Sequence, residues 1–225
     1  FSTDSRNIRN PGRLTEVFAQ DFTARGGTLK PEAVTGLAGT PEGKWRVTTD
    51  GGEAIADIVV VAAGAWSRRI AKMVGVKLLL DTERGYHVMF KNPSQMPRNP
   101  MMMTTGKFAV TPMQDGLRCA GTVEFGGIKL GPSKAPIQLL RRRMAEAFPQ
   151  MTYDSSEEWM GFRPSTPDSL PLIGELASSG IYTAFGHQHV GLTAGPKTGR
   201  LIADLITGRL PNIDMRPYDP QRYKQ

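Results

Sequence analysis

Apolar residues near the start of the chain recur at helical spacing. Asn10-Pro11 precedes them and is typical of a helix start, because asparagine caps the first amides and proline lacks only an N–H that would be unpaired there. Gly26-Gly27 follows them and is typical of a helix end. The pattern predicts one amphipathic helix, with the apolar positions Leu14, Val17, Phe18 and Phe22.

Strand-like runs follow this helix. Two short ones cover 32–39 and 44–49, and a third, IADIVVVAAG, covers 55–64. The third run is continuously apolar, which is typical of a strand buried on both faces. It leads directly into a predicted helix that ends near Gly75. A buried strand, a turn of small residues and a helix form a common setting for a nucleotide site.

The middle of the chain has a different pattern. Short β-like runs at 84–91, 100–105, 107–112 and 117–125 are separated by Pro, Gly, Asn and Asp, which predicts an antiparallel sheet built from hairpins. A helix is expected at about 135–148, with an apolar stripe of Ile137, Leu140, Met144 and Phe148. The methionines at 101–103 favour gap-filling core or a cavity wall over metal ligation.

The last third of the chain again shows the pattern of strands followed by a helix that is found in the first third. EEWMGFRP and GIYTAFG are predicted strands, and a helix is expected from Ala194 to Gly208 with Pro196 in its first turn, where proline is tolerated. The order of elements indicates an α/β fold with an antiparallel α+β insert. The expected parts are 1–80 and 161–225, which belong together, and 81–160, which is the insert.

Composition adds two constraints. The 225 residues carry a formal charge of +7, which favours anionic partners, but Arg141-Arg142-Arg143 is too short a basic run to indicate nucleic acid and is expected to be a solvated helix face. Cys119 is the one cysteine, so an internal disulfide is excluded and a small buried strand residue is expected. No apolar run approaches the roughly 18 residues of a membrane span.

The stretch FGHQHVGLTAGPKTGR, residues 185–200, allows two interpretations. His187 and His189 would share one face of a strand and could bind a metal, but a zinc site needs further ligands and the chain offers only His87 and Cys119. The sequence therefore predicts no metal. Alternatively, Gly186 and Gly191 lead to a helix start that stabilises negative charge on a phosphate or a reduced flavin. An ordinary strand-to-helix connection stays open.

Two arginines are candidates for binding a carboxylate. Arg163 follows an apolar strand and is fixed by Pro164, so its guanidinium suits paired hydrogen bonds to a carboxylate. The alternative is a salt bridge to Asp168. Arg84 lies near Tyr86, with Glu83 as its alternative partner.

Three stretches in order and spacing resemble the FAD-dependent amine and D-amino-acid oxidoreductases, which include D-amino-acid dehydrogenase, glycine oxidase and sarcosine oxidase. They are ADIVVVAAGAWSRRIAKMVG…RGYHV, GTVEF, and GFRPSTPDSLPLIG…GHQHVGLTAGPKTGRLIADLITG, and the similarity covers most of residues 10–223. The resemblance implies part of a glutathione-reductase-like FAD-binding α/β domain with an antiparallel substrate domain inserted.

The resemblance also implies a site. Arg163 would bind the amino-acid carboxylate, with Tyr86 and Arg84 as further catalytic candidates. Hydride would pass from the substrate Cα to flavin N5, and the imine would then hydrolyse; no general base is nominated. The residues expected to contact FAD are Val34, Ala62, Ala63, Gly64, Trp66, Gly186, His187, His189, Val190, Gly191, Leu192 and Thr193.

One family feature is absent from the sequence. The family opens with a strand and a G-x-G-x-x-G turn that holds the FAD pyrophosphate, and no such motif occurs here. The expectation is a C-terminal portion whose partner is the N-terminal half of the same polypeptide, and which alone binds FAD weakly. A D-amino-acid dehydrogenase is expected, in the cytoplasm or peripheral to the inner membrane, with quinone or oxygen as acceptor and without nucleic acid. A glycine, sarcosine or D-proline type oxidase and a cofactor-free structural fragment are the alternatives.

Overall fold

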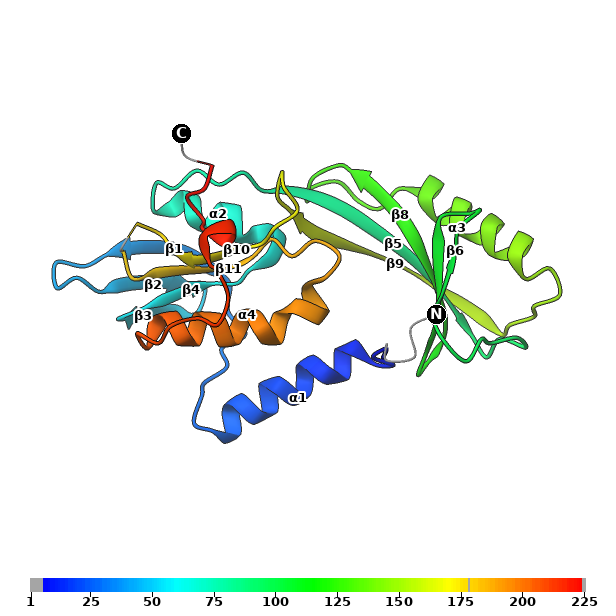
Figure 1. Cartoon of the computed structure of the whole chain (residues 1–225), viewed down its shortest axis with the longest axis horizontal. Helices are drawn as coiled ribbons and strands as arrows, with labels where there is room; N and C mark the ends of the chain where they lie inside the picture. The colour runs from blue at the N-terminus through cyan, green and yellow to red at the C-terminus, as the bar shows by residue number, and fades with distance from the viewer. Residues whose placement is uncertain (1–5, 178, 224–225) are drawn as a thin grey trace. The chain divides into compact units, whose positions relative to one another are not determined.

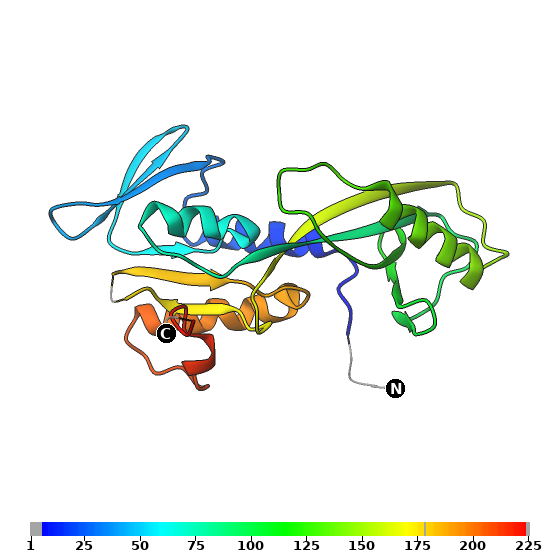
Figure 2. The same cartoon turned by 90° about the horizontal axis from the view of Figure 1, so that it is seen from above.

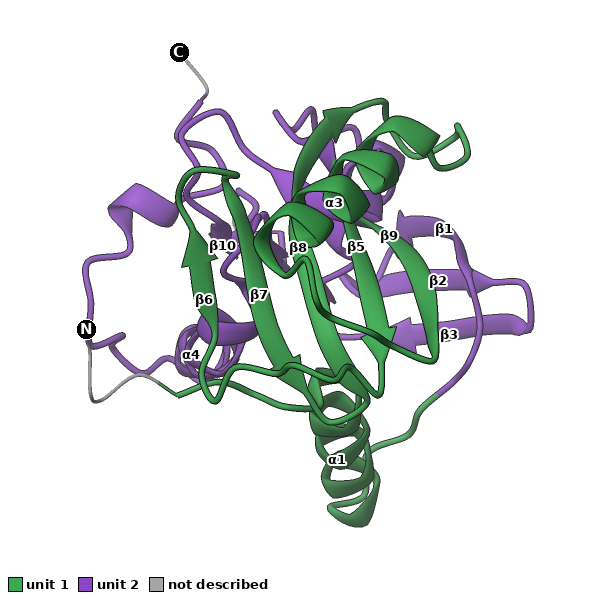
Figure 3. Ribbon diagram, turned by 90° about the vertical axis from the view of Figure 1, so that its right-hand side faces the viewer, with its two compact units in different colours: residues 1–29, 84–161 green, residues 30–83, 162–225 purple. Residues whose placement is uncertain are grey.

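The computed structural model describes residues 6–177 and 179–223 (Figure 1). The chain divides into two compact units (Figure 3). Unit 1 comprises residues 1–29 and 84–161, and unit 2 comprises 30–83 and 162–225. No helix in the described ranges is long and apolar enough to cross a membrane.

Unit 1 contains a five-stranded sheet in the order β6-β7-β8-β5-β9. The bounds are β5 Asp81–Lys91, β6 Met101–Met103, β7 Phe108–Met113, β8 Gly116–Phe125 and β9 Ser155–Ser165. β6 pairs with β7, and β7 with β8, as antiparallel neighbours. The predicted strands and hairpins of the middle part are therefore confirmed. Of the three methionines in β6, Met103 packs against the core and Met102 is 68% exposed.

Helix α3 (Lys134–Ala147) covers one face of this sheet (Figure 3). Its predicted apolar stripe is confirmed, because Ile137, Leu140 and Met144 are buried and Phe148 packs partly against them. Cys119 is fully buried in β8, as expected. Of the basic run, only Arg142 is on the exposed side of α3, with its side chain 70% exposed, because Arg141 and Arg143 are half-buried and Arg141 pairs with Glu158 at 2.9 Å. The buried cluster under α3 also contains Tyr86, Val88, Phe90, Phe108, Val110 and Leu117.

Helix α1 (Pro11–Ala24) begins as predicted. The Asn10 side chain accepts a hydrogen bond of 2.8 Å from the Arg13 amide, and Pro11 is the first helical residue. Its apolar stripe, however, is not buried by the described residues: Phe18 is 55% exposed and Phe22 is 49% exposed. Helical spacing identified the helix correctly but did not determine its burial.

Unit 2 contains two small sheets (Figures 1 and 2). The first is an antiparallel meander of β1 (Val34–Gly39), β2 (Trp45–Thr49) and β3 (Gly52–Ala56). The second has the order β10-β11-β4, in which β11 (Ile181–Phe185) runs antiparallel to β10 (Leu172–Glu175) and parallel to β4 (Val59–Val61). The sequence prediction missed β10, which is only four residues long.

The prediction of one buried strand over 55–64 is wrong. The run is divided between β3 and the three residues of β4, and Asp57 between them is exposed and paired with Lys44 at 2.9 Å. Within the described residues Val61 is buried, but Val60 is 41% exposed and Ile55 is 54% exposed. Continuous apolar composition is compatible with a two-sided strand but does not require it, because burial depends on what packs against each face.

Three helical segments and a final turn complete unit 2. After the 3₁₀ turn η1 (Gly64–Trp66), α2 (Ser67–Met73) ends before Gly75 as predicted. Helix α4 (Gly191–Ile206) begins three residues earlier than predicted, so Pro196 lies inside the helix and not in its first turn. Leu201 and Ile202 pack α4 against Ile173 of β10. The last element is the 3₁₀ turn η2 (Arg216–Tyr218).

We expect Leu140→Ala to destabilise the protein strongly. Leu140 is fully buried between α3 and the sheet, so its truncation leaves a cavity and should lower the free energy of unfolding by about 2–5 kcal/mol. Urea unfolding measures the change. Met102→Ala, at an exposed position of β6, is the control and should change the free energy by less than about 0.5 kcal/mol. Equal losses in the two variants would contradict the assigned core.

Candidate functional site

Two loops leave the same edge of the small sheet in unit 2. β4 and β11 are adjacent and parallel, with Val61 opposite Thr183, so their carboxyl ends lie together. The loop 62–66 follows β4, and the loop 186–190 follows β11 and leads into α4. In open α/β sheets, ligands bind outside the carboxyl ends of parallel strands. This edge is the candidate functional site.

The first loop has an unusual backbone and an unsatisfied hydroxyl. Gly64 has φ of 54°, a left-handed conformation that favours glycine, and it starts the η1 turn. Trp66 is 46% exposed and its ring meets that of Phe162 edge-on at 5.6 Å. Ser67 Oγ is buried and has no hydrogen-bond partner among the described residues. A buried hydroxyl without a partner is costly, so this position suits a ligand that can pair with it.

The second loop contains two residues in the left-handed backbone conformation. Gly186 has φ of 91°, and a Cβ there would lie 3.0 Å from Thr166 Cγ2. Gln188 has φ of 46° and is fixed by two hydrogen bonds. Its amide donates to the Pro164 carbonyl at 3.2 Å, and its Nε2 donates to the Thr166 carbonyl at 3.3 Å. The loop therefore depends on the segment that follows β9.

His187 and His189 have separate partners. His187 Nε2 lies 2.8 Å from Thr198 Oγ1, and burial lowers its pKa. His189 Nε2 lies 3.2 Å from Glu83 Oε2, at the distance but not in the geometry of a hydrogen bond. β11 ends at Phe185, so the strand alternation expected to place both rings on one face does not apply. No group of three or more metal-ligating side chains occurs in the part of the chain that the structure describes.

The start of α4 completes this edge. The first amides of a helix precede its internal hydrogen bonds, so those of Gly191 and Leu192 point outward at the positive end of the helix dipole. Val190 and Leu192 are exposed apolar residues beside them. The structure thus brings together most residues expected to contact a cofactor. Val34 begins β1, and its carbonyl accepts a hydrogen bond of 2.9 Å from Arg69 of α2.

Arg163 lies between residues that contact both loops. It is half-buried near the end of β9. Its predecessor, Phe162, meets Trp66 of the first loop, and the carbonyl of its successor, Pro164, accepts from Gln188 of the second. The carboxylate of Asp168, the alternative partner considered for Arg163, pairs with Arg222 at 2.8 Å.

Arg84 is buried in unit 1 and holds a loop. A guanidinium has five N–H donors, and each of those of Arg84 has an acceptor. The side chain is 2% exposed, and a Cβ at Gly126 would lie 2.8 Å from its Cζ. The expected pairing with Glu83 is corrected to Glu124. The acceptors are the carbonyls of Gly126, Gly127, Leu130 and Gly131 at 2.7–3.1 Å, and Glu124 Oε2 at 3.4 Å.

Tyr86 belongs to the same network. Its hydroxyl donates to Glu124 Oε2 and accepts from the Ser133 amide at 3.1 Å, and Ser133 Oγ donates to Glu124 Oε1 at 2.6 Å. Hydrogen bonds from Ser133 and Tyr86, and then Arg84, lower the pKa of Glu124. Ser133 precedes the first residue of α3, so the network joins β5 and β8 to the start of that helix. These contacts favour a structural role for Tyr86 and Arg84.

The opposite face of the same strand carries groups that the sequence prediction missed. Because side chains alternate along β5, His87 points away from the face that holds Tyr86 and α3. Its ring stacks on Trp159 with centroids 4.9 Å apart, and the Trp159 indole occupies the space above Gly161. Burial, and then the charge of Arg118, lower the pKa of His87 to about 4. Strand alternation was the signal that could have identified His87.

Comparisons with known proteins agree on one family. The family model described as FAD dependent oxidoreductase (DAO) matches residues 1–205. The chain is 41% identical over 225 residues to a D-amino-acid oxidase of Bradyrhizobium diazoefficiens, and the match covers 98% of this chain and 53% of that protein. It is 34% identical over 229 residues to a glycine oxidase of Pseudomonas aeruginosa, covering 95% and 59%.

The fold agrees with a solved structure. The crystal structure of glycine oxidase from Geobacillus kaustophilus superimposes with a TM-score of 0.83 at 27% identity, over 94% of this chain and 58% of that one. The chain spans about half the length of the two curated relatives, 53% and 59%. The two loops and all but the last residue of α4 lie within the residues that the family model matches.

We expect His87 to make the stability of the chain depend on pH. The folded protein disfavours the charged imidazole, whose pKa is about 4, whereas the unfolded chain takes up the proton near its ordinary value of 6.5. Stability should therefore be fully present above about pH 6.5 and fall as the pH drops from there to about 4. Urea unfolding at about pH 7 and about pH 5 should show a smaller difference in His87→Asn than in the wild type. An unchanged difference would contradict the assignment.

Proposed function

Because this chain belongs to the DAO family of FAD-dependent oxidoreductases, we propose that it forms part of a flavoenzyme that oxidises the Cα–N bond of a D-amino acid. The observation that carries the proposal is the common edge of β4 and β11, where two glycine-bearing loops meet and where the neighbours of Arg163 contact both. The name of the Bradyrhizobium relative supports D-amino acids as the substrate class.

The residues at this edge fit a flavin. Gly64 and Gly186 allow a flat ring system close to the backbone, and the first amides of α4 would stabilise negative charge on its pyrimidine side. Ser67 Oγ, buried without a partner in the described part of the chain, could pair with a polar atom of the group. When bound, the flavin supplies a two-electron acceptor for the hydride on the substrate Cα.

The protein's own contribution is binding and alignment. Arg163 would hold the substrate carboxylate in paired hydrogen bonds, and its backbone is fixed on both sides by Phe162 and Pro164. Fixing one end of a small amino acid orients its Cα–H, and orientation of this kind accounts for a large share of catalysis. No side chain is assigned as a general base. Tyr86 and Arg84 are assigned to the support of loop 126–131.

An oxidase for glycine, sarcosine or a D-proline-like substrate is the second candidate. It is favoured by the structural agreement with a glycine oxidase. A panel of D-amino acids, glycine and sarcosine distinguishes the two when it is read by anaerobic bleaching of the flavin in a polypeptide that also contains a dinucleotide-binding half. Hydrogen peroxide formation on admitting air indicates oxygen as acceptor, and reduction of an added quinone indicates a dehydrogenase.

We expect the 225-residue chain alone to bind FAD weakly or not at all. The sequence contains no G-x-G-x-x-G turn to hold the pyrophosphate, so only the flavin end of the cofactor would be contacted. Quenching of FAD fluorescence during a titration measures the affinity. Stoichiometric FAD retained through purification would contradict the expectation. A protein that stays colourless even with a dinucleotide-binding half supplied would instead support a cofactor-free structural role.

We expect Arg163→Ala to lower kcat/KM for amino acids in the flavin-loaded enzyme by about tenfold to several hundredfold. The reason is that the substrate carboxylate would be partly desolvated without a hydrogen-bond partner of opposite charge. Arg163→Lys should recover only part of this, since an ammonium cannot reproduce the planar fork. Steady-state kinetics with amino acids and with amines that lack a carboxylate provide the measurement.

Arg142→Ala, on the exposed side of α3, is the matched control and should behave like the wild type. Equal losses for substrates with and without a carboxylate would contradict the role proposed for Arg163 and would assign it to the flavin side or to structure.

A further inference from the structure

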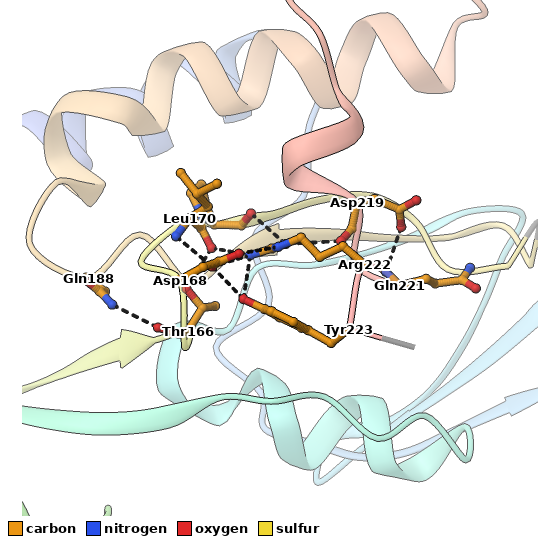
Figure 4. Close-up of polar contacts among 9 residues, drawn as sticks. Thr166, Asp168, Leu170, Gln188, Asp219, Gln221, Arg222 and Tyr223 are labelled. Carbon is orange, nitrogen blue, oxygen red and sulfur yellow. Dashed lines mark hydrogen bonds and ion pairs between the residues drawn. The ribbon is translucent and has the colours of Figure 1, made fainter. Parts of the chain in front are cut away.

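Residues 219–223 of unit 2 fold back onto the segment 166–171 (Figure 4). Arg222 Nε and Nη2 donate to the two carboxylate oxygens of Asp168, each at 2.8 Å, and the Tyr223 hydroxyl donates to the same carboxylate at 2.6 Å. The guanidinium also lies over the Tyr223 ring at 4.5 Å. Arg222 and then Tyr223 hold the pKa of Asp168 well below its usual range. We call these three residues the C-terminal clasp.

The clasp gives the segment 166–171 its shape. The Leu170 amide donates to Asp168 Oδ1 at 3.0 Å, while the Leu170 carbonyl accepts from Arg222 Nη2 at 2.8 Å and from Thr166 Oγ1 at 2.7 Å. Ser169 has φ of 64°, so the backbone is in an uncommon conformation at the tip. Conformations of this kind persist when surrounding contacts determine them. Here Arg222 donates four hydrogen bonds to the segment, two to the Asp168 carboxylate and one each to the carbonyls of Leu170 and Pro171.

The segment 166–171 in turn supports the loop 186–190. The Thr166 carbonyl accepts from Gln188 Nε2 at 3.3 Å, and Thr166 Cγ2 lies 3.0 Å from the position a Cβ would take on Gly186 (Figure 4 shows the first contact). Gly186 and Gln188 are the two left-handed residues of that loop. A continuous set of contacts therefore joins the clasp to the candidate functional site.

We infer that the C-terminal clasp positions the loop 186–190. Asp168, Arg222 and Tyr223 are positioning residues that fix Thr166, and Thr166 holds Gly186 and Gln188 in their left-handed conformations. The consequence for a bound flavin rests on the function proposed above, whereas the effect on the loop does not. Loss of the clasp should release the loop while the surrounding sheet stays folded.

A second arginine pair in the same segment offers a matched comparison. Arg216 binds Asp214 through both carboxylate oxygens at 2.7–3.0 Å, but the two residues are only two positions apart in sequence and their side chains are 91% and 50% exposed. Exposed pairs contribute little to stability. The clasp instead spans 54 residues, and the Arg222 side chain is 12% exposed. The two pairs have similar hydrogen-bond geometry and the same charges, but they differ in the burial of the arginine and in the separation of the partners along the sequence.

Amide hydrogen exchange on the 225-residue chain tests the inference. In Arg222→Ala we expect the amides of 186–191 to exchange about tenfold faster or more, while those of β1–β3 keep the wild-type rate. Arg222→Lys should give an intermediate rate, because it keeps the charge without the two-pronged geometry. Arg216→Ala should match the wild type throughout.

Two results would overturn the inference: wild-type exchange at 186–191 in a folded Arg222→Ala protein, or the same acceleration in every strand, which would mean general destabilisation. If Arg222→Ala does not fold, Tyr223→Phe takes its place. It removes one hydrogen bond of the clasp and should accelerate exchange at 186–191 alone, by less than Arg222→Ala. No change, or a uniform change, in Tyr223→Phe would overturn the inference as well.

The test separates this inference from the proposed function. If the loop is released as expected but no flavin binds even with a dinucleotide-binding half supplied, the proposed function fails and the positioning role stands. If the enzyme binds flavin and oxidises amino acids while Arg222→Ala leaves exchange at 186–191 unchanged, the positioning role fails and the function stands.

Discussion

The parallel pairing of β4 with β11 is the constraint on which the candidate site depends. Three residue pairs form it, from Val59 with Ile181 to Val61 with Thr183. Because the two strands run the same way, the loops after them emerge at one edge; in an antiparallel pair, such as β10 with β11, the following loops leave at opposite ends. So short a pairing relies on its packing, and Val61, Ile181 and Thr183 are all buried. The core of unit 2 thereby fixes where the two loops meet.

Arginine performs two different tasks in this chain. Arg84 and Arg222 each bind backbone carbonyls of a loop together with a carboxylate. In a sheet, such carbonyls accept hydrogen bonds from a neighbouring strand, and in these loops the guanidinium N–H groups donate to them instead. Arg163 lies in a strand, and the residues before and after it, Phe162 and Pro164, contact the two loops of the site. A buried arginine is therefore not by itself a sign of substrate recognition, and the nature of its acceptors decides between the two tasks.

Local patterns predicted the elements well, and long-range packing determined the rest. The spacing of α3 and the cap of α1 are properties of neighbouring residues, so the sequence was sufficient for them. The apolar run 55–64 was not, because its exposure depends on distant partners. Tyr86 was named from the family resemblance, whereas alternation along β5 places His87 on the opposite face without showing which face a helix covers. The pairing of Asp168 with Arg222 leaves no local trace, since 54 residues separate them. The glycines and the helix start of the second loop were found because their conformational demands are local.

The burial of Cys119 has a practical consequence. It is the sole thiol of the chain, it lies between β8 and α3 with no exposed surface, and burial raises its pKa to about 12. Thiolate is the reactive form, so the native chain should not react with alkylating reagents at neutral pH. A cysteine introduced on the second loop would then carry a spectroscopic label without background. The rate at which the native thiol is modified would in turn measure how often the structure opens locally between α3 and the sheet.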